Sequence, residues 1–478
     1  MDINIYKEKI DRLNQTMKKR DIDLYRCHYH LMPLTGKLGD PNGMYQYNGV
    51  YHIFYVYLPL SFVESKRTPC VWGHYSTLDF IHYKINPIAL YPDHPRDKDG
   101  AYSGSLLLDE DKRYIYYTGN VRYDGDYDYV LSGREQNVMR VESSDGINFS
   151  NKKLIMTNDD YPENVTQHVR DPFLFKENGK LYMFLGARNK NGKGIVLVYE
   201  GEDLEHFHYL NEISTQNTFG YMWECPDFFQ IENQQILVAC PQGVEHEEYR
   251  FQNKHQCGYF FLKGDFKKEY ILSDFYQFDY GFDYYAARTF LDQKKRRILI
   301  GWLGMSEADY SQSITFNNGW DQVIALPREL IYKDGHIYQQ PLKEYKQLRK
   351  KHQQLNPKNH IQIKGLVFEM VLRFHHSQDI TIRLREDCEI TYNQKEKVLI
   401  LSMDTCGDGR TVRKMKLSSL EKIQIFSDVT SLELFINDGY ATMSTRIFGN
   451  SKKISISSFE GFADYYEMSA FQLSGFDN

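Results

Sequence analysis

The sequence predicts an all-β protein, with a five-bladed β-propeller followed by a C-terminal β-sandwich. Two observations predict this fold. A hairpin pattern occurs five times before residue 340, and short alternating strands follow residue 356. The composition agrees, because 15% of the residues are aromatic, including 38 Tyr and 29 Phe, and aromatic side chains favour strands and sugar-stacking surfaces.

The first hairpin is the most regular. Met44–Tyr47 and Val50–Tyr55 are rich in aromatic and β-branched residues, and they flank Asn48-Gly49, a strong short hairpin signal. Asp40 stands just before these two strands, in the stretch Asp40-Pro41-Asn42-Gly43. The pattern therefore predicts that Asp40 opens a β-hairpin.

The same layout recurs four more times. The later copies begin at Ser103-Gly104-Ser105, Arg170-Asp171-Pro172, Glu224-Cys225-Pro226-Asp227 and, less regularly, Asp283-Tyr284-Tyr285. The copies are 53 to 68 residues apart when measured between Asp40, Ser103, Asp171, Glu224 and Ala286. Each interval can hold one four-stranded sheet, and five radial sheets make a propeller. The first strand of each blade lines the axis of a propeller. We therefore expect the three acids at the hairpin starts, Asp40, Asp171 and Glu224, to face one another.

The N-terminal residues predict a helix over 3–20. Ile5, Ile10, Leu13 and Met17 recur at helical spacing, with charged residues elsewhere. We expect this face to pack on the propeller, which makes 1–340 one catalytic domain.

The remaining chain predicts a linker and a second domain. Leu342–His352 is charged and lacks β-branched residues, so we expect a helical linker at 341–355. Residues 356–478 contain short strands joined by turns, such as Leu432–Ile436 before Asn437-Asp438-Gly439, which is typical of a β-sandwich.

Composition excludes several function classes. The net charge of −6 gives no basic footprint for nucleic acid, and no run of roughly 18 apolar residues exists to span a membrane. Seven Cys without a CxxC pair and 16 scattered His predict no disulfide framework, metal site or cofactor. The first 30 residues lack the apolar region of a signal peptide, so we expect the cytoplasm. The oligomeric state stays open, with a homo-oligomer among the alternatives.

The three acids each have an ordinary structural explanation. Asp40 fits a β-turn, Asp171 an ion pair with Arg170, and Glu224 a surface position. Their recurrence at one place in a repeated unit favours a shared site instead. Glycosidic cleavage needs two such carboxylates, one to protonate the leaving oxygen and one to attack the anomeric carbon or direct water to it. We therefore expect a small carbohydrate as substrate.

The motifs resemble glycoside hydrolase family 32, the β-fructofuranosidases. The similarity lies in Gly39-Asp40-Pro41-Asn42-Gly43, Arg170-Asp171-Pro172, Trp223-Glu224-Cys225-Pro226-Asp227 and weaker matches such as Trp72-Gly73-His74, Tyr102-Ser103-Gly104-Ser105 and Phe435-Ile436-Asn437-Asp438-Gly439. The resemblance implies a propeller followed by a sandwich. It also implies Asp40 as nucleophile, Glu224 as general acid/base, and Asp171, with Arg170, as the holder of fructose hydroxyls and stabiliser of the transition state.

The motifs and hairpin starts also suggest residues that bind substrate. We expect contacts from Asn42, Trp72, Ser103, Arg170 and Tyr285. A buried Trp72 and a turn role for Ser103 are the simpler alternatives. Direct attack by Asp40 predicts retention of configuration and a gap of about 5–5.5 Å between its carboxyl and that of Glu224. Trp223, Cys225 and Asp40 lead us to expect a raised pKa for Glu224.

Two residues depart from the family pattern and leave the substrate open. Gly39 replaces the usual Asn before the nucleophile, and Val56 replaces a Gln in the following strand. Sucrose, sucrose 6-phosphate and short fructo-oligosaccharides are the alternatives within the family, and a phosphate would draw on Arg122, Arg134, Arg140 or Arg188. Two other classes remain, namely an inverting arabinan or xylan hydrolase with a five-bladed propeller, and a non-catalytic sugar-binding propeller.

Overall fold

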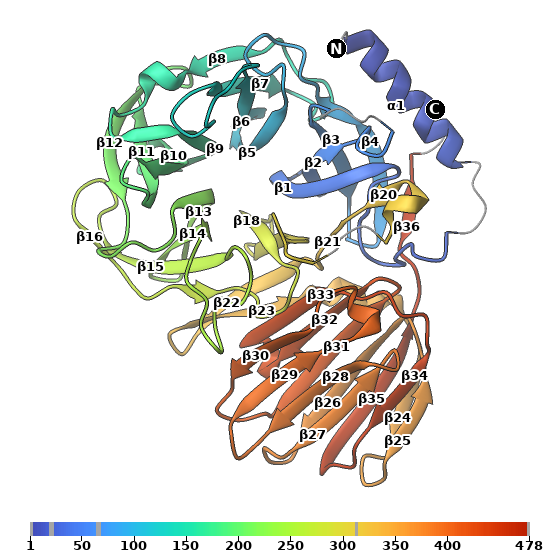
Figure 1. Ribbon diagram of the computed structural model, residues 1–478. Helices are drawn as coiled ribbons and strands as arrows, with labels where there is room; N and C mark the ends of the chain where they lie inside the picture. Colours follow the sequence, from blue (N-terminus) through green and yellow to red (C-terminus); the bar gives the residue numbers. More distant parts are fainter. Residues whose placement is uncertain (1–2, 19–22, 64–67, 311–313, 476–478) are drawn as a thin grey trace.

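The computed structural model describes residues 3–18, 23–63, 68–310 and 314–475. Within these ranges the strands form seven sheets, five mainly from residues 36–341 and two from residues 349–468. Figure 1 shows the five sheets arranged in a ring, with the last two sheets, orange to red, below it. No helix of the described residues is long and apolar enough to cross a bilayer.

The five sheets of the ring share one plan, in which four successive strands pair antiparallel. They are β1 (Gly36–Tyr47), β2 (Val50–Leu58), β3 (Val71–Thr77) and β4 (His82–Leu90); β5 (Ala101–Asp109), β6 (Lys112–Arg122), β7 (Arg134–Ser143) and β8 (Lys153–Met156); β9 (Val165–Glu177), β10 (Lys180–Asn189), β11 (Gly194–Gly201) and β12 (Phe207–Ile213); β13 (Met222–Ile231), β14 (Gln234–Gln242), β15 (Gly258–Gly264) and β16 (Tyr270–Leu272); and β18 (Tyr285–Leu291), β19 (Arg297–Leu303), β22 (Arg328–Lys333) and β23 (His336–Pro341).

The first strands of the five sheets meet at the centre. β1 contacts β5, β5 contacts β9, β9 contacts β13, β13 contacts β18, and β18 returns to β1. Short strands extend three of the sheets: β17 (Tyr276–Gln277), β20 (Trp320–Asp321), β21 (Val323–Ile324) and β36 (Gln472–Ser474). β20 and β36 join opposite edges of the first sheet in parallel pairing, with β1 and β4, so segments far apart in the sequence add strands to this sheet.

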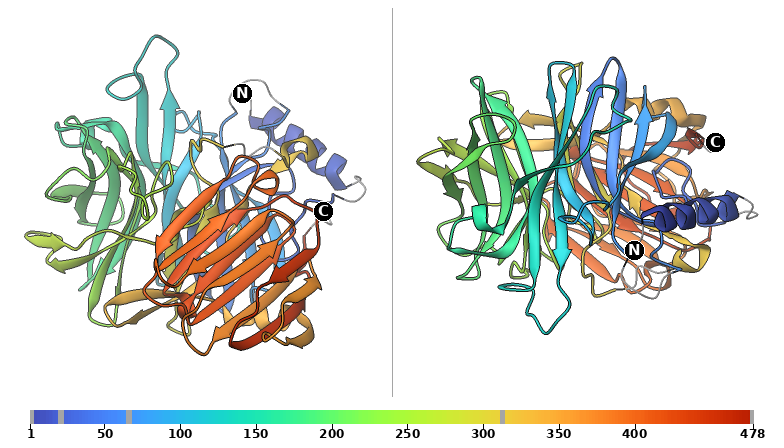
Figure 2. Two further views of the ribbon diagram at one scale, coloured as in Figure 1. Left: turned by 60° about the horizontal axis from the view of Figure 1, so that its bottom comes forward. Right: turned by 90° about the horizontal axis from the view of Figure 1, so that it is seen from above.

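The predicted N-terminal helix is present as α1 (Ile3–Lys18), and residues 19 and 20 lie outside the described residues. Its buried face differs in part from the prediction. Tyr6 and Ile10 are buried and Leu13 packs beside them, but Ile5 is 51% exposed. The Tyr6 hydroxyl donates to the Pro69 carbonyl at 2.6 Å, which anchors α1 to the segment before β3. Figure 2 shows α1 on the outside of the ring.

The predicted helical linker at 341–355 is wrong. A 3₁₀ helix covers Lys343–Leu348, and β24 (Arg349–Leu355) then pairs antiparallel with β35 (Gly461–Met468). Five exposed side chains lie along this edge strand, so its charged sequence is compatible with a strand. Arg349 also makes two hydrogen bonds with the buried Glu369, a tertiary pairing that outweighs local helix propensity.

The last two sheets enclose one hydrophobic core. Each has six strands. One contains β24, β35, β26 (Phe368–Phe374), β31 (Lys422–Asp428), β32 (Ser431–Ile436) and β33 (Ala441–Arg446), and the other β25 (Ile361–Lys364), β34 (Lys453–Ile456), β27 (Ile380–Leu384), β28 (Cys388–Asn393), β29 (Val398–Ser402) and β30 (Val412–Lys416). Further 3₁₀ turns lie at Asn158–Asp160, Phe316–Asn318, Thr405–Gly407 and Asn437–Gly439.

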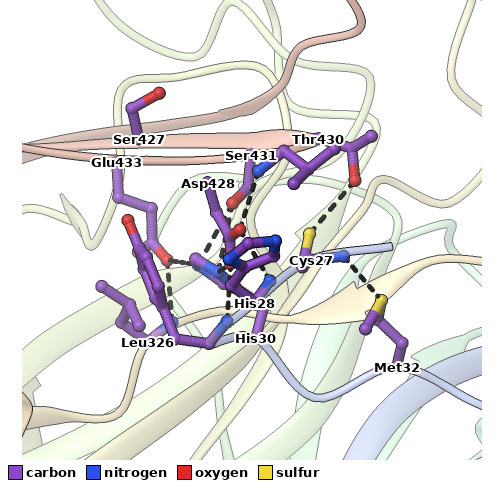
Figure 3. A network of polar contacts seen from close by, with 12 residues as sticks. Cys27, His28, His30, Met32, Leu326, Ser427, Asp428, Thr430, Ser431 and Glu433 are labelled. Atoms are coloured by element: carbon purple, nitrogen blue, oxygen red, sulfur yellow. Dashed lines mark hydrogen bonds and ion pairs between the residues drawn. The ribbon is translucent and has the colours of Figure 1, made fainter. Parts of the chain in front are cut away.

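A buried charge cluster joins the segment before β1 to the second domain (Figure 3). His30 Nδ1 lies 2.9 Å from Asp428 Oδ2, and His30 Nε2 lies 3.0 Å from Glu433 Oε1. Both ring nitrogens face carboxylates, so both donate and the imidazole is positively charged. Arg328 of β22 adds a 2.8 Å bond to Glu433 Oε2. These ion pairs fix the position of the second domain relative to the ring.

The same region has donor atoms that could suit a metal. Atoms of Cys27, His30 and Asp428 lie within 4.8 Å of one another. All of them already have protein partners. Cys27 Sγ lies 3.1 Å from Thr430 Oγ1, and Asp428 accepts backbone N–H groups in addition to bonding His30. We therefore assign no metal to this cluster.

Candidate active site

Each first strand of the ring carries a β-bulge of one extra residue. Two residues of the first strand lie opposite one residue of the second strand in all five sheets. The bulged pairs are Gly39-Asp40, Tyr102-Ser103, Asp171-Pro172, Cys225-Pro226 and Ala286-Ala287. Bulges redirect side chains, and here they occur where the first strands converge.

The bulges show that the three acids are not at one equivalent position. Asp40 is the second bulge residue, Asp171 the first, and Glu224 the residue just before the bulge. In the third, fourth and fifth sheets the first bulge residue also has a left-handed backbone, because Asp171, Cys225 and Ala286 have φ of 62°, 51° and 50°. The expectation of one shared position is therefore wrong by one or two residues, since the sequence repeat does not reveal the bulge.

The acids nevertheless line one cavity of about 560 Å³. Its wall includes Asp40, Asp171 and Glu224 together with Val56, Leu58, Thr68, Cys70, Asp99, Tyr102, Ser103, Arg134, Gln136, His168, Arg170, Arg188, Tyr221, Gln242, Ser306 and Glu307. Of the two departures from the family pattern, Val56 lies on this wall and Gly39 lies beside it, because a Cβ at Gly39 would be 3.6 Å from Val56 Cβ. The cavity is large enough for a small sugar.

Asp40 lies at the centre of the acid group. Ser103 Oγ donates to Asp40 Oδ2 at 2.6 Å, and Cys225 Sγ lies 4.0 Å from the same oxygen. Burial raises the pKa of Asp40 to about 7; the Ser103 hydrogen bond opposes this shift, and the charges of Asp171 and Glu224 add to it. Asp40 therefore carries a proton at mildly acidic pH.

Glu224 is held by four hydrogen bonds. Arg170 donates to Oε1 from Nε at 2.9 Å and from Nη2 at 2.6 Å. Tyr285 and Gln242 donate to Oε2 at 2.6 Å and 2.8 Å. Burial alone would raise the pKa of Glu224, but the charge of Arg170 and these hydrogen bonds hold it below its usual value. The expected raised pKa is therefore wrong for the unliganded protein.

Asp171 is fixed by backbone contacts. The Cys225 N–H donates to Asp171 Oδ2 at 2.9 Å, and the Asp171 N–H donates to Thr118 Oγ1 at 2.8 Å. Burial raises the pKa of Asp171, although Arg170 opposes the shift. The side chain is only 3% exposed, so it has little freedom to reorient.

The five predicted substrate-binding residues fall into two groups. Ser103 and Arg170 line the cavity. Tyr285 is 2% exposed and does not line it, so its predicted direct contact is wrong, and its hydroxyl donates to Glu224 instead. Asn42 and Trp72 are fully buried and do not line the cavity, so their predicted direct contacts are wrong.

The two buried residues support the site instead. Asn42 donates to the Asp40 carbonyl at 2.9 Å and accepts from the Gly104 N–H at 3.0 Å. Trp72 Nε1 donates to the Tyr102 carbonyl at 3.0 Å. Each links the first sheet to the second, which fixes Asp40 relative to Ser103.

Several cavity residues were missed by sequence reasoning. Gln242 lies at the end of β14 and bonds Glu224, and Gln136 Oε1 and His168 Nδ1 accept from Arg170 Nη1 at 3.2 Å and 3.0 Å. They lie outside the hairpin-start motifs. Strand pairing brings Gln242 of β14 and Gln136 of β7 to the site, whereas His168 lies on the first strand β9, two residues before Arg170.

A buried carboxylate pair in a sugar-sized cavity, on a protein built of strands, defines a glycoside hydrolase. Family models agree: the glycosyl hydrolases family 32 N-terminal domain matches residues 30–341, and the family 32 C-terminal model matches residues 336–472. The chain belongs to glycoside hydrolase family 32.

Individual relatives cover nearly the whole chain. The sucrose-6-phosphate hydrolase of Bacillus subtilis (strain 168) is 33% identical over 89% of both chains, and that of Staphylococcus xylosus is 31% identical over 99% of this chain and 97% of its own. The raffinose invertase of Escherichia coli is 33% identical over 90% of this chain and 91% of its own.

Solved structures show the same fold. The sucrose-6-phosphate hydrolase from Lactobacillus gasseri superposes with a TM-score of 0.87 at 28% identity, covering 97% of this chain and 96% of the other. A Bombyx mori GH32 beta-fructofuranosidase gives a TM-score of 0.84 at 28% identity, covering 98% and 99%.

Proposed function

We propose that this protein hydrolyses the β-fructofuranosyl bond of sucrose or sucrose 6-phosphate with retention of configuration. The observation that carries the proposal is the meeting of Asp40 and Glu224 in one cavity, each with its own fixed partners. Relatives across nearly the full length are named for sucrose 6-phosphate hydrolysis, which supports this substrate class.

The reaction needs two steps. Asp40 attacks the anomeric carbon of the fructosyl unit while Glu224 protonates the leaving oxygen, which gives a covalent fructosyl-enzyme and free glucose or glucose 6-phosphate. Glu224 then accepts a proton from water, and the hydroxide so formed displaces Asp40. Buried Asp171 stabilises the positive charge that develops on the sugar ring and accepts hydrogen bonds from its hydroxyls.

The two carboxyls must exchange their protonation roles before cleavage. At mildly acidic pH burial favours a proton on Asp40, while Arg170 and the Tyr285 hydrogen bond lower the pKa of Glu224 and favour its ionised form. The productive form, with Asp40 ionised and Glu224 protonated, carries the same number of protons. It is therefore reached by moving one proton between coupled groups.

We propose that the ring is a five-bladed β-propeller and that residues after 349 form a β-sandwich. Five separate antiparallel sheets, the closed ring of contacts between their first strands and the core shared by the last two sheets support this assignment. The domain boundary then lies within Lys343–Leu348.

The two competing functions have less support. An inverting arabinan or xylan hydrolase disagrees with the family 32 models that match both halves of the chain. A non-catalytic sugar-binding propeller gives no reason for three acids in one cavity.

Incubation with sucrose, sucrose 6-phosphate, arabinan and xylan, followed by sugar analysis, tests the proposal. Release of fructose supports it. Arabinose or xylose release, or no release at all, would reject it.

The cytoplasm remains the proposed location. All seven cysteines lie among the described residues, are buried and form no disulfide, as expected for a reducing compartment. Fractionation of the source cells, with antibody detection in the soluble and secreted fractions, tests this assignment.

A further inference from the structure

The loop between β14 and β15, residues 243–257, links the second domain to the active site. Its middle, 252–253, contacts β30 of the second domain, and its end, 255–256, pairs with the end of β14. Gln242 is the last residue of β14 and donates to Glu224 Oε2 at 2.8 Å. A short stretch of backbone therefore connects the second domain to the proposed acid/base.

The first contact with the second domain is made by Gln252. Its Nε2 donates to the Lys414 carbonyl at 2.6 Å, and the Lys414 N–H donates to its Oε1 at 3.0 Å. Lys414 lies on β30, an edge strand of its sheet. An edge strand has backbone groups without strand partners, and the Gln252 amide pairs with two of them as a neighbouring strand would.

The second contact is made by Asn253, whose side chain is buried between the two domains. Arg413 of β30 donates to Asn253 Oδ1 from Nε at 2.9 Å and from Nη2 at 2.7 Å. Asn253 Nδ2 donates to the Gly281 carbonyl at 2.8 Å. The Arg413 guanidinium also lies 4.0 Å from the centroid of the Phe282 ring. These contacts fix the middle of the loop.

The end of the loop is tied to β14 through its backbone. His255 forms an isolated antiparallel bridge with Gln242, and the Gln256 N–H donates to the Pro241 carbonyl at 2.9 Å. Gln256 Nε2 donates back to the Asn253 carbonyl at 2.8 Å. The turn between the two anchors is therefore short and cross-linked, so a shift at Asn253 moves the backbone that pairs with Gln242.

His255 shows how far the site depends on this loop. Its side chain is 1% exposed, and neither ring nitrogen makes a hydrogen bond within the part of the chain that the structure describes. Nε2 lies 3.6 Å from Glu307 Oε2, beyond hydrogen-bond range. The ring centroid lies 6.1 Å from that of Tyr285, the other donor to Glu224 Oε2. Packing and the loop backbone, rather than hydrogen bonds, hold this ring in place.

We propose that Arg413 and Asn253 are positioning residues for Glu224, acting through the loop and Gln242. This deepens the proposed function and rests on it. Proton transfer to the leaving oxygen requires the carboxyl of Glu224 within hydrogen-bond reach of that oxygen, and Gln242 holds one of its two oxygens. The second domain therefore fixes the orientation of the proton donor as well as covering one side of the ring.

The test separates proton donation from the other steps by changing the leaving group. A nitrophenolate leaves without a proton, so kcat/KM for a nitrophenyl β-fructofuranoside needs little help from Glu224, whereas kcat/KM for sucrose needs it fully. Gln242→Leu should lower kcat/KM for sucrose about tenfold, the value of one hydrogen bond to a charged group, and affect the nitrophenyl substrate far less.

Arg413→Ala should show the same selective loss, about threefold or more on sucrose, and Arg413→Lys should restore part of it. Asn253→Asp is the milder variant if Arg413→Ala does not fold, because it keeps an acceptor for Arg413 but loses the bond to the Gly281 carbonyl. Arg383→Ala is the matched control, since Arg383 forms an exposed ion pair with Glu389 in the same sheet and should leave both rates unchanged.

A double variant tests whether the effect passes through Gln242. In a Gln242→Leu background, Arg413→Ala should cause less than about twofold further loss on sucrose, because the bond that it disturbs is already absent. Additive losses in the double variant, or equal losses on both substrates in Arg413→Ala, would overturn the positioning role. A purely structural role would lower the melting temperature without this substrate dependence.

Hydrogen exchange gives a readout that does not depend on turnover. In Arg413→Ala the amides of 253–256 and of Gln242 should exchange about tenfold faster than in the wild type or in Arg383→Ala, because the anchor at β30 is lost. Unchanged protection would overturn the link between the second domain and Gln242, whatever the substrate is. Failure of the wild type to release fructose from either substrate would instead reject the proposed function.

Discussion

Arg170 binds a single oxygen of Glu224, Oε1, through both Nε at 2.9 Å and Nη2 at 2.6 Å. The residue proposed to protonate the leaving group is therefore held as a carboxylate in the unliganded protein. Asp40, the proposed nucleophile, holds the proton instead. A substrate that draws Arg170 toward its own hydroxyls would release Glu224 and permit the proton to move.

This arrangement predicts a bell-shaped pH dependence of kcat/KM. Above about pH 7 both carboxyls are ionised, so no proton is available for the leaving oxygen and activity falls. Below the depressed pKa of Glu224 both are protonated, so no nucleophile remains. Initial rates measured at substrate concentrations well below KM, from pH 3 to pH 9, give kcat/KM and check the profile. A rate that keeps rising above pH 8 would contradict it.

Tyr285→Phe tests whether the pKa of Glu224 sets the acid limb, the fall in kcat/KM at low pH. Tyr285 donates to Glu224 Oε2 at 2.6 Å, so removing its hydroxyl should raise the pKa of Glu224 and move the acid limb to higher pH. Tyr284→Phe is the matched control, because the buried Tyr284 hydroxyl has no hydrogen-bond partner among the described residues. An acid limb that moves equally in both variants would rule out this role for Tyr285.

Asp40→Asn and Glu224→Gln should each lower kcat about 10³-fold or more, since each removes a group that takes part in bond cleavage. Asp171→Asn should be severe too, with an added rise in KM. Glu232→Gln makes the same change at an exposed site in the turn of the Glu224 hairpin and should leave kcat intact. Thermal melts verify folding. Less than tenfold loss in Asp40→Asn or Glu224→Gln refutes the assignment.

The reaction should retain the configuration at the fructose anomeric carbon. Direct attack by Asp40 requires its carboxyl to lie about 5–5.5 Å from that of Glu224 in the substrate complex, too close for an intervening water. Reaction in the presence of methanol traps the stereochemistry, and NMR should identify methyl β-fructofuranoside. The α-anomer as the initial product would indicate inversion.

The charge cluster at His30 predicts that stability depends on pH. Burial opposes protonation, but Asp428 and Glu433 raise the pKa of His30 to about 9. This lies above the unfolded value of about 6.5, so the contribution is complete below about pH 6.5 and is lost as the pH rises through 9. The free energy of unfolding should therefore fall between pH 7 and 10.

His30→Gln isolates this effect from other titrating groups. Breaking the buried ion pair should cost about 3–5 kcal/mol at pH 7, and the difference from wild type should shrink toward pH 10. His28→Gln, at an exposed neighbouring position, is the control. Denaturant unfolding at several pH values gives both quantities. A difference that stays constant with pH would show that His30 is not the titrating group.

The sequence by itself determined most of the strands and turns and pointed to the three acids that line the cavity. Asn48 and Gly49 adopt φ of 48° and 82°, the left-handed values that two-residue hairpin turns require, so this turn follows from local chemistry. Alternating apolar residues similarly indicate strands without knowledge of their partners. Such signals lie within a few residues of one another, which is why they can be read from the chain alone.

Only the tertiary structure decided how those acids are used. Arg170 and Glu224 are 54 residues apart, and their pairing exists because β9 and β13 lie side by side at the centre of the ring. The burial of Trp72 and the pairing of β24 with β35 depend in the same way on distant segments. Protonation follows from these contacts, since a carboxyl takes its pKa from the charges and burial around it rather than from its neighbours in sequence.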